Sequence, residues 1–427
     1  MANSFLDNWA NLKAIKKYMG VNLQNRSVRS NIWKLYILKG LEFAWFPIPV
    51  IILFYENNGL SFEKSLLLKT ILSLSIFIFE IPSGYFADIF GRKACLVLGG
   101  LVWTLGLLFY CFQTSFTAFA IAEILSGLAG SLISGANTAL GFDSLVEMKQ
   151  EQNYRHVEGK LGAIAGIVEA ICGLIGGLVA AINLVYPFYL QTICLFLYFL
   201  LALSLVEPNL YQSSVDPFQA NTNRRNRQAI NHRAIWEAIR FSLLENKNVK
   251  WLILFSANFG IATFLAVWLS QADMQSRGIA VSNFGFAWAA FHFIMSFASL
   301  KATSIENLWG TKKVFLGLVL SLGLSYIFLG LINQVWGMIF IALIYFSRGV
   351  RNPLTLNHIN QNVSSSIRAT VLSINSFVFR LGFIAIAPVI GWITQNYNLD
   401  IALFLFGSIF IIFGVFCWHK LVKLRVI

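Results

Sequence analysis

The chain has 427 residues, of which 57% are apolar and 12% are charged, and its mean hydropathy is +0.68. A soluble domain carries about 25% charged residues, so this composition excludes an ordinary soluble globular protein and indicates an integral membrane protein. Membrane orientation and contact with anionic lipids explain the net charge of +13. The short basic run 224–227 has no folded soluble module around it, so we expect no nucleic-acid partner.

Twelve segments each have about 20 mostly apolar residues, the length that a helix needs to cross a bilayer. The predicted spans are 32–55, 66–87, 94–112, 116–140, 160–182, 185–206, 248–271, 282–303, 313–332, 335–357, 368–394 and 400–421. A polar stretch at 207–247 divides them into two blocks of six. The sequence therefore predicts an all-α integral membrane protein with twelve transmembrane helices in two pseudo-symmetric six-helix bundles.

The predicted domains are a cytoplasmic amphipathic N-terminus (1–31), a first bundle (32–206), a cytoplasmic linker (207–247) and a second bundle with a short tail (248–427). The N-terminus and the second part of the linker mix spaced apolar residues with charges, which predicts helices on the inner membrane surface. Segment 134–145 shares Gly and Leu positions with segment 348–359. This weak repeat supports a duplicated unit.

The distribution of Lys and Arg predicts the orientation, because these residues in short loops resist crossing the membrane. Most of them fall on the predicted inner side, and the predicted outer side carries Lys64, Lys69 and Arg277. The first 31 residues contain no apolar core long enough for a signal peptide. We therefore expect a multi-pass protein of the inner (plasma) membrane with both termini in the cytoplasm.

The segment GYFADIFGRK, residues 84–93, lies in the short gap between the second and third predicted spans. Its glycines permit a tight turn, its aspartate can face a helix N-terminus, and its basic pair can anchor at the cytoplasmic surface. This G-x-x-x-D-x-x-G-R-K pattern resembles the loop between the second and third spans of the Major Facilitator Superfamily. The chain is similar in character to bacterial proton-coupled exporters of drugs or metabolites. The predicted gating residues of this loop are Gly84, Asp88, Gly91, Arg92 and Lys93.

The resemblance implies roles for particular residues. In this superfamily the aspartate that matches Asp88 contacts the start of the eleventh span and stabilises the outward-open state, and the residue that matches Arg92 contributes. A first-span carboxylate, as at Glu42, occurs in several proton-driven drug exporters. The exporter signature G-P-x-x-G-G appears at 172–177 without its proline, and Glu123 is the ionisable residue nearest to the place of a fourth-span arginine that is absent. The resemblance favours export.

Ionisable residues inside the predicted spans need a reason, because each costs about 2.5–3.5 kcal/mol in hydrocarbon. Burial favours a neutral carboxyl group, so Glu42 and Glu169, with Glu80, are predicted to bind and release protons. Arg348 and Arg380 are predicted to hold an anionic group of a substrate. The acids lie in the first bundle and the bases in the second, and the predicted substrate cavity contains Glu123, His292, Arg348 and Arg380.

These residues also have a structural interpretation, in which static ion pairs fix the packing of the bundles. Glu80, next to the loop, equally fits a gate or a hydrogen-bonding role, and His292 fits a satisfied interior histidine. Asp143, at the inner end of the fourth span, is predicted to belong to a gate and to pair with Arg155 or cap a helix.

The sequence thus predicts a secondary active transporter that moves a small organic molecule by alternating access, through proton-coupled efflux. A proton symporter that imports an organic anion is the alternative, and a transport-inactive sensor or a membrane enzyme is a more distant one. We found neither a Ser/His/Asp set nor metal-ligand spacing, so we expect no enzymatic activity, no cofactor and no metal. The expected partners are a small-molecule substrate, protons and membrane lipids, with the protein as a monomer.

Overall fold

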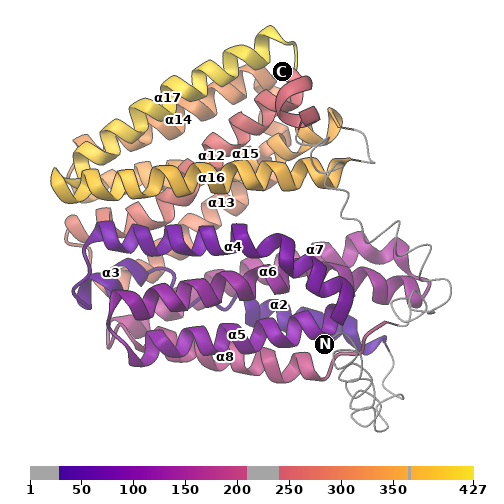
Figure 1. The fold of residues 1–427 in the computed structure, drawn as a ribbon. Helices are drawn as coiled ribbons and strands as arrows, with labels where there is room; N and C mark the ends of the chain where they lie inside the picture. Colours follow the sequence, from indigo (N-terminus) through magenta and orange to yellow (C-terminus); the bar gives the residue numbers. More distant parts are fainter. Residues whose placement is uncertain (1–27, 209–239, 364–366) are drawn as a thin grey trace, which may run out of the picture.

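The computed structural model describes residues 28–208, 240–363 and 367–427, and every regular element in these ranges is a helix (Figure 1). The first half contains α2 (Ser30–Glu42), α3 (Ile51–Asn57), α4 (Phe62–Phe90), α5 (Arg92–Phe112), α6 (Phe116–Glu147), η1 (Glu151–Asn153), α7 (Tyr154–Ala180) and α8 (Tyr186–Leu203). The second half contains η2 (Phe241–Glu245), α12 (Lys247–Ser276), α13 (Val281–Trp309), α14 (Thr311–Leu331), η3 (Val335–Gly337), α15 (Met338–Gln361), α16 (Arg368–Asn396) and α17 (Leu399–Lys423). The predicted amphipathic segments lie mostly outside the described residues.

Ten of these helices are long and apolar enough to cross a membrane: α4 to α8, α12 to α14, α16 and α17. Each half has one further span. In the second half it is α15, whose apolar character is reduced by Arg348 and Arg351, and in the first half it is the pair α2 and α3. The predicted membrane fold of twelve helical spans in two bundles is confirmed.

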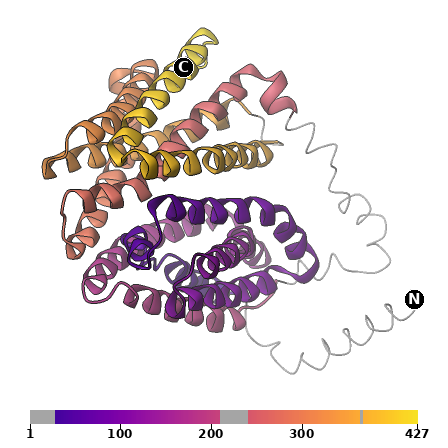
Figure 2. The same ribbon diagram turned by 60° about the vertical axis from the view of Figure 1, so that its left-hand side comes forward.

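The two bundles lie one above the other in Figure 1 and remain distinct in the turned view (Figure 2). They meet along two pairs of helices, α4 against α16 and α7 against α13. One apolar core cluster runs from α3 and α4 of the first half into α12 and α13 of the second. Any site between the bundles must therefore be built on these facing helices and on α15 behind them.

The first span differs from the predicted continuous helix over 32–55. α2 ends at Glu42 and α3 begins only at Ile51. Pro47 and Pro49 lie in the gap, and proline has no backbone N–H and disfavours helical geometry in the residue before it. The hydropathy of this segment is that of one span, but its backbone is interrupted near the membrane interior.

Two glutamines satisfy backbone groups that the interruption leaves without helical partners. Phe46 donates its N–H to Oε1 of Gln191 at 3.2 Å. Gln271 of α12 makes two bonds to this segment: its Oε1 accepts from the N–H of Ile52 (3.0 Å), and its Nε2 donates to the carbonyl of Ile48 (2.9 Å). Such pairing is required where an irregular backbone is buried away from water. Because Gln271 belongs to the second half, it also ties the two bundles together.

The glycines of α7 show where the bundles touch. A Cβ at Gly173 would collide with Trp288 of α13, and a Cβ at Gly177 would collide with Gly285. Small residues permit this close crossing. On the same face of α7, nearer its start, a Cβ would meet open space at three glycines: Gly159, Gly162 and Gly166. The helices therefore touch near the end of α7 and diverge toward its start.

The second helix pair behaves in the same way. A Cβ at Gly391, near the end of α16, would lie 3.0 Å from the Cα of Glu63 at the start of α4. At the other end of α4, a Cβ at Gly84 would meet open space. We call the end of the molecule with Glu63 and Gly391 the closed end, and the end with the α4–α5 turn the turn end.

Candidate functional site

A polar contact joins the two bundles through Glu169 and His292. Oε1 of Glu169 on α7 lies 3.7 Å from Nε2 of His292 on α13. Arg348 of α15 interacts electrostatically with both side chains. The structure thus brings together an acid of the first bundle and two bases of the second, one helical turn from the crossing at Gly173.

Aromatic rings surround this contact. The ring of Trp288 lies 4.4 Å from that of His292, and the ring of Tyr345 lies 5.7 Å from that of His292. All three side chains are buried. Within the described chain, Nε1 of Trp288 and Nε2 of His292 have no hydrogen-bond partner, although buried polar atoms usually have one. The contact is therefore enclosed by apolar surface and retains unused hydrogen-bonding capacity.

A second charged pair spans α4 and α16. Arg380 interacts electrostatically with Glu80 across the two helices. Oε2 of Glu80 and Nε of Arg380 are buried and lack a hydrogen-bond partner in the part of the chain that the structure describes. The rings of Phe77 and Phe377, one turn away on each helix, are 4.5 Å apart. Acids and bases thus face one another across both helix pairs.

Arg351 belongs to this group of charges but was missed in the sequence. It lies one turn after Arg348 on α15, and the two guanidinium groups interact as like charges. Its guanidinium lies 6.0 Å from the ring of Phe259 on α12. The sequence feature that could have identified Arg351 is its i, i+3 spacing from Arg348, which places both arginines on one face of a helix.

Glu42 lies apart from these pairs, inside the first bundle. It is buried at the end of α2, 3.2 Å from Nζ of Lys39 on the same helix, and it accepts a 3.1 Å hydrogen bond from Asn137 of α6. Lys39 was not singled out in the sequence, although it stands three residues before Glu42. Among the described residues, Glu42 makes no contact with the Glu169–His292 pair or with the Glu80–Arg380 pair.

Glu123 lies in another buried network near the closed end. Oε1 of Glu123 pairs with Nζ of Lys69 on α4 and accepts bonds from the hydroxyls of Tyr55 and Tyr110, each at 2.7 Å. Nζ of Lys69 also lies 5.0 Å from the ring of Trp268 on α12, in the other bundle.

Two of the basic residues counted on the predicted outer side, Lys69 and Arg277, have buried side chains. Lys69 is 3% exposed and lies about two turns after the start of α4 at Phe62. Arg277 is also buried, bonded to both carboxylate oxygens of Asp273 at 2.7 Å.

At the turn end, the predicted gating residues form a chain of ionic contacts. Asp88 pairs with Arg92 at 3.0 Å, and Nε of Arg92 lies 3.8 Å from Asp143 at the end of α6. The contact that Asp143 makes is thus with Arg92, where the sequence suggested Arg155. The side chain of Asp88 is 70% exposed.

Glu207 completes the turn and was missed in the sequence. Its carboxylate accepts hydrogen bonds from the backbone N–H groups of Arg92 (2.8 Å) and Lys93 (2.7 Å), the first residues of α5. A carboxylate at a helix N-terminus is favourable because the N–H groups there have no helical partner. Gly91 has φ +97°, and a Cβ there would lie 2.8 Å from the carboxyl carbon of Glu207, so glycine fits both the turn and the contact.

The second half repeats this arrangement in part. Gly310 has φ +79° between α13 and α14, and Glu306 accepts a 2.9 Å bond from Thr311. Oε1 of Glu306 also lies 3.0 Å from Nε2 of His358 on α15. In both bundles, therefore, the turn contacts the second long helix that follows it, α6 in the first bundle and α15 in the second.

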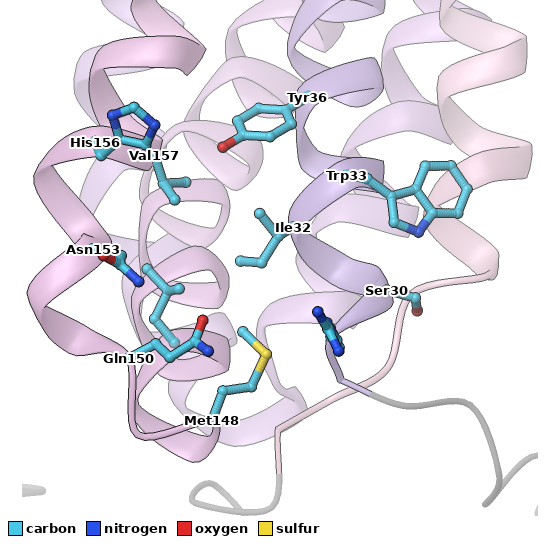
Figure 3. Close-up of a pocket in the computed structure, with 11 residues that line it drawn as sticks. Ser30, Ile32, Trp33, Tyr36, Met148, Gln150, Asn153, His156 and Val157 are labelled. Carbon is cyan, nitrogen blue, oxygen red and sulfur yellow. The ribbon is translucent and has the colours of Figure 1, made fainter.

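A separate cavity of about 670 Å³ lies within the first bundle at the turn end (Figure 3). The start of α2 lines one side, and the end of α6, η1 and the start of α7 line the other. It contains none of the ionisable residues described above. In the described ranges, no group of three or more His, Cys, Asp or Glu side chains is arranged to hold a metal ion.

Comparisons with known proteins agree with this architecture. A family model described as Major Facilitator Superfamily matches residues 40–305. The MFS-type transporter YxaM of Bacillus subtilis (strain 168) is 23% identical over 400 residues, which covers 91% of this chain and 94% of that protein. Multidrug resistance protein 2 of the same organism is also 23% identical, over 90% of this chain and 92% of its own length.

Solved structures show the same fold at low sequence identity. The nucleoside transporter NupG superposes with a TM-score of 0.74 at 12% identity, over 91% of this chain and 98% of its own. A D-xylose-proton symporter gives a TM-score of 0.65 at 14% identity, over 92% and 98%.

Proposed function

Because the chain belongs to the Major Facilitator Superfamily and is a multi-pass membrane transporter, we propose that it exports a small organic molecule in exchange for protons. The contact of Glu169 with His292, within electrostatic reach of Arg348, carries this proposal. These groups belong to opposite bundles, so a change in their charge changes the attraction between the bundles.

Glu169 is the proton carrier in this mechanism. When Glu169 is ionised, it attracts Arg348 and holds α7 against the second bundle. When it binds a proton, this attraction is lost and Arg348 becomes available to an anionic group of the substrate. Glu80 and Arg380 repeat the arrangement across α4 and α16. Ionised Glu169 and an anionic group of the substrate therefore compete for the same arginine, which couples the proton on Glu169 to the occupancy of the site.

Export is favoured by the relative that is named a multidrug resistance protein. Import of an organic anion together with protons is the second candidate, because the arginines of α15 and α16 suit an anion in either direction. We place the protein in the plasma membrane as a monomer, with both termini and the turn end in the cytoplasm. The positive charges of the turn at Arg92 and Lys93 support this orientation.

The sign of proton movement tests the proposal. The purified protein is reconstituted in vesicles that contain a pH-sensitive dye, and a substrate gradient is imposed without a pH gradient. Exchange predicts that protons move against the direction of the substrate. Protons that move with the substrate would establish symport, and substrate flux without proton movement would remove the coupling.

A further inference from the structure

The arginines between the bundles outnumber the acids. Arg348 interacts with Glu169 and Arg380 interacts with Glu80, and Arg351 adds a third positive charge beside Arg348. With neutral histidine, the region has a formal charge of +1. No carboxylate lies within 4.0 Å of any of the three guanidinium groups among residues 28–208, 240–363 and 367–427.

Arg348 and Arg351 are the pair most in need of a counter-charge. They lie one turn apart on α15 and repel each other. Nε of Arg351 is buried and has no hydrogen-bond partner in the described chain. The N–H donors of two adjacent guanidinium groups can pair with the two oxygens of one carboxylate. A single negative charge also balances the excess, whereas a phosphate monoester carries between −1.5 and −2 charges at neutral pH.

Aromatic side chains border both arginines. Tyr345 precedes Arg348 by one turn, and its ring packs 5.7 Å from His292 and 6.4 Å from Trp288. On the other side, the ring of Phe259 lies 6.0 Å from the guanidinium of Arg351. Both rings are buried and make the wall beside the arginines apolar, which favours a ligand whose charged group is carried by an apolar ring.

We propose that the site takes an aromatic carboxylate, whose carboxylate bridges Arg348 and Arg351 and whose ring lies against the aromatic side chains beside them. This inference rests on the proposed function in one respect, namely that the bound anion is the transported substrate. Binding itself is measurable without a proton gradient.

The test is calorimetric titration of the full-length protein in nanodiscs with 1-naphthoate, with empty nanodiscs as the blank. We expect saturable binding at one site. Two probes separate the parts of the proposal: 1-naphthamide keeps the ring without the charge, and cyclohexanecarboxylate keeps the charge without the aromatic ring. Each should bind at least tenfold more weakly than 1-naphthoate. Equal binding of either probe, or no binding of 1-naphthoate, would overturn the proposed substrate class.

Variants locate the carboxylate. Arg348→Gln and Arg351→Gln should each weaken 1-naphthoate binding at least tenfold, whereas Arg155→Gln, an exposed arginine on α7, should leave it unchanged. If Arg351→Gln fails to fold, Arg351→Lys retains the charge without the fork of donors and should still weaken binding. Unchanged binding in the Arg351 variants would overturn the assignment.

The outcomes for binding and for coupling are distinguishable. A protein that moves protons with another substrate but ignores 1-naphthoate defeats the substrate class alone. A protein that binds 1-naphthoate without proton movement defeats the coupling alone.

Discussion

At the scale of single residues, Glu169 differs from the other buried acids in its partners. Glu42 and Glu123 pair with lysines of their own bundle, whereas Glu169 faces a histidine and an arginine of the other bundle. A charge change at Glu42 or Glu123 alters packing inside a bundle. A charge change at Glu169 alters the contact between bundles, which is the contact that alternating access must break.

Glu169→Gln should therefore uncouple transport. The amide keeps the size of the side chain but cannot exchange a proton, so accumulation driven by a pH gradient should fall at least tenfold while substrate exchange at equal pH persists. Vesicle uptake with and without an imposed pH difference measures both. The matched control is Glu158→Gln on the same helix near the turn end. A Glu169→Gln protein that accumulates substrate as the parent does would remove Glu169 from coupling.

Lys69→Met should destabilise the protein. The change leaves the Glu123 carboxylate buried with only the two tyrosine hydroxyls, and removal of one partner from a buried ion pair costs about 3–5 kcal/mol. Thermal unfolding in detergent should show a clearly lower midpoint for Lys69→Met and partial recovery in the double variant with Glu123→Gln. Lys64→Met, at an exposed position of the same helix, serves as control. A midpoint equal to the parent's would mean that the pair contributes nothing.

The sequence identified the buried ions better than their partners. Glu169, His292 and Arg348 stand out because a charge inside an apolar span is unusual wherever it occurs. The pairing of Glu123 with Lys69 joins positions 54 residues apart and depends on how two helices are rotated. Hydropathy carries no information on that rotation.

At the scale of helices, the interrupted first span depends on side chains from elsewhere. Pro47 and Pro49 are visible in the sequence and disfavour a continuous helix, but the hydropathy of 32–55 is continuous. Whether such a break is tolerated depends on partners for the freed backbone groups. Gln191 and Gln271 supply them from distant helices, so the feature emerges only from the assembled fold.

Gln271→Leu should open the closed end. The change removes both hydrogen bonds from α12 to the backbone around α3, so the bundles lose a link there and the population should shift toward the state open at that end. Spin-label distances between the bundles at the closed end measure the shift. The control is Gln191→Leu, which removes a backbone bond inside the first bundle without cutting a link between bundles. Identical distance distributions in the parent and in Gln271→Leu would contradict the role of this residue.

At the scale of the whole molecule, α7 and α13 pack in an antiparallel register that can be continued beyond their contact. Gly177 meets Gly285, Gly173 meets Trp288, and Glu169 meets His292. From one pair to the next, the α13 residue lies further toward the end of its helix as the α7 residue lies further toward the start of its own. Continued toward the turn end, the same register pairs the three glycines that now face open space with three exposed hydroxyl residues of α13: Gly159 with Thr303, Gly162 with Ser299, and Gly166 with Ser296.

All six of these residues are small, so the two helix faces can close on each other without steric conflict. As the bundles rock, the contact between α7 and α13 would then move from the closed end toward the turn end, along the stripe formed by these facing residues of the two helices. Glu169 and His292 lie at the centre of this stripe. Their contact would become the pivot between the two states, and its charge would bias which end is closed.

Cysteines at Gly162 and Ser299 should report this closure. In a cysteine-free background, the Gly162→Cys/Ser299→Cys pair should cross-link under oxidation when substrate and a pH difference drive turnover, and the cross-link should abolish transport until it is reduced. The control is Gly162→Cys/Ser304→Cys, because Ser304 lies five residues further along α13 and on another face of the helix. Equal cross-linking in the two pairs, or none in the first during turnover, would show that the stripe does not close in this register. Cross-linking confined to the first pair would mean that the sequence of α7 and α13 already encodes the second state of the transporter.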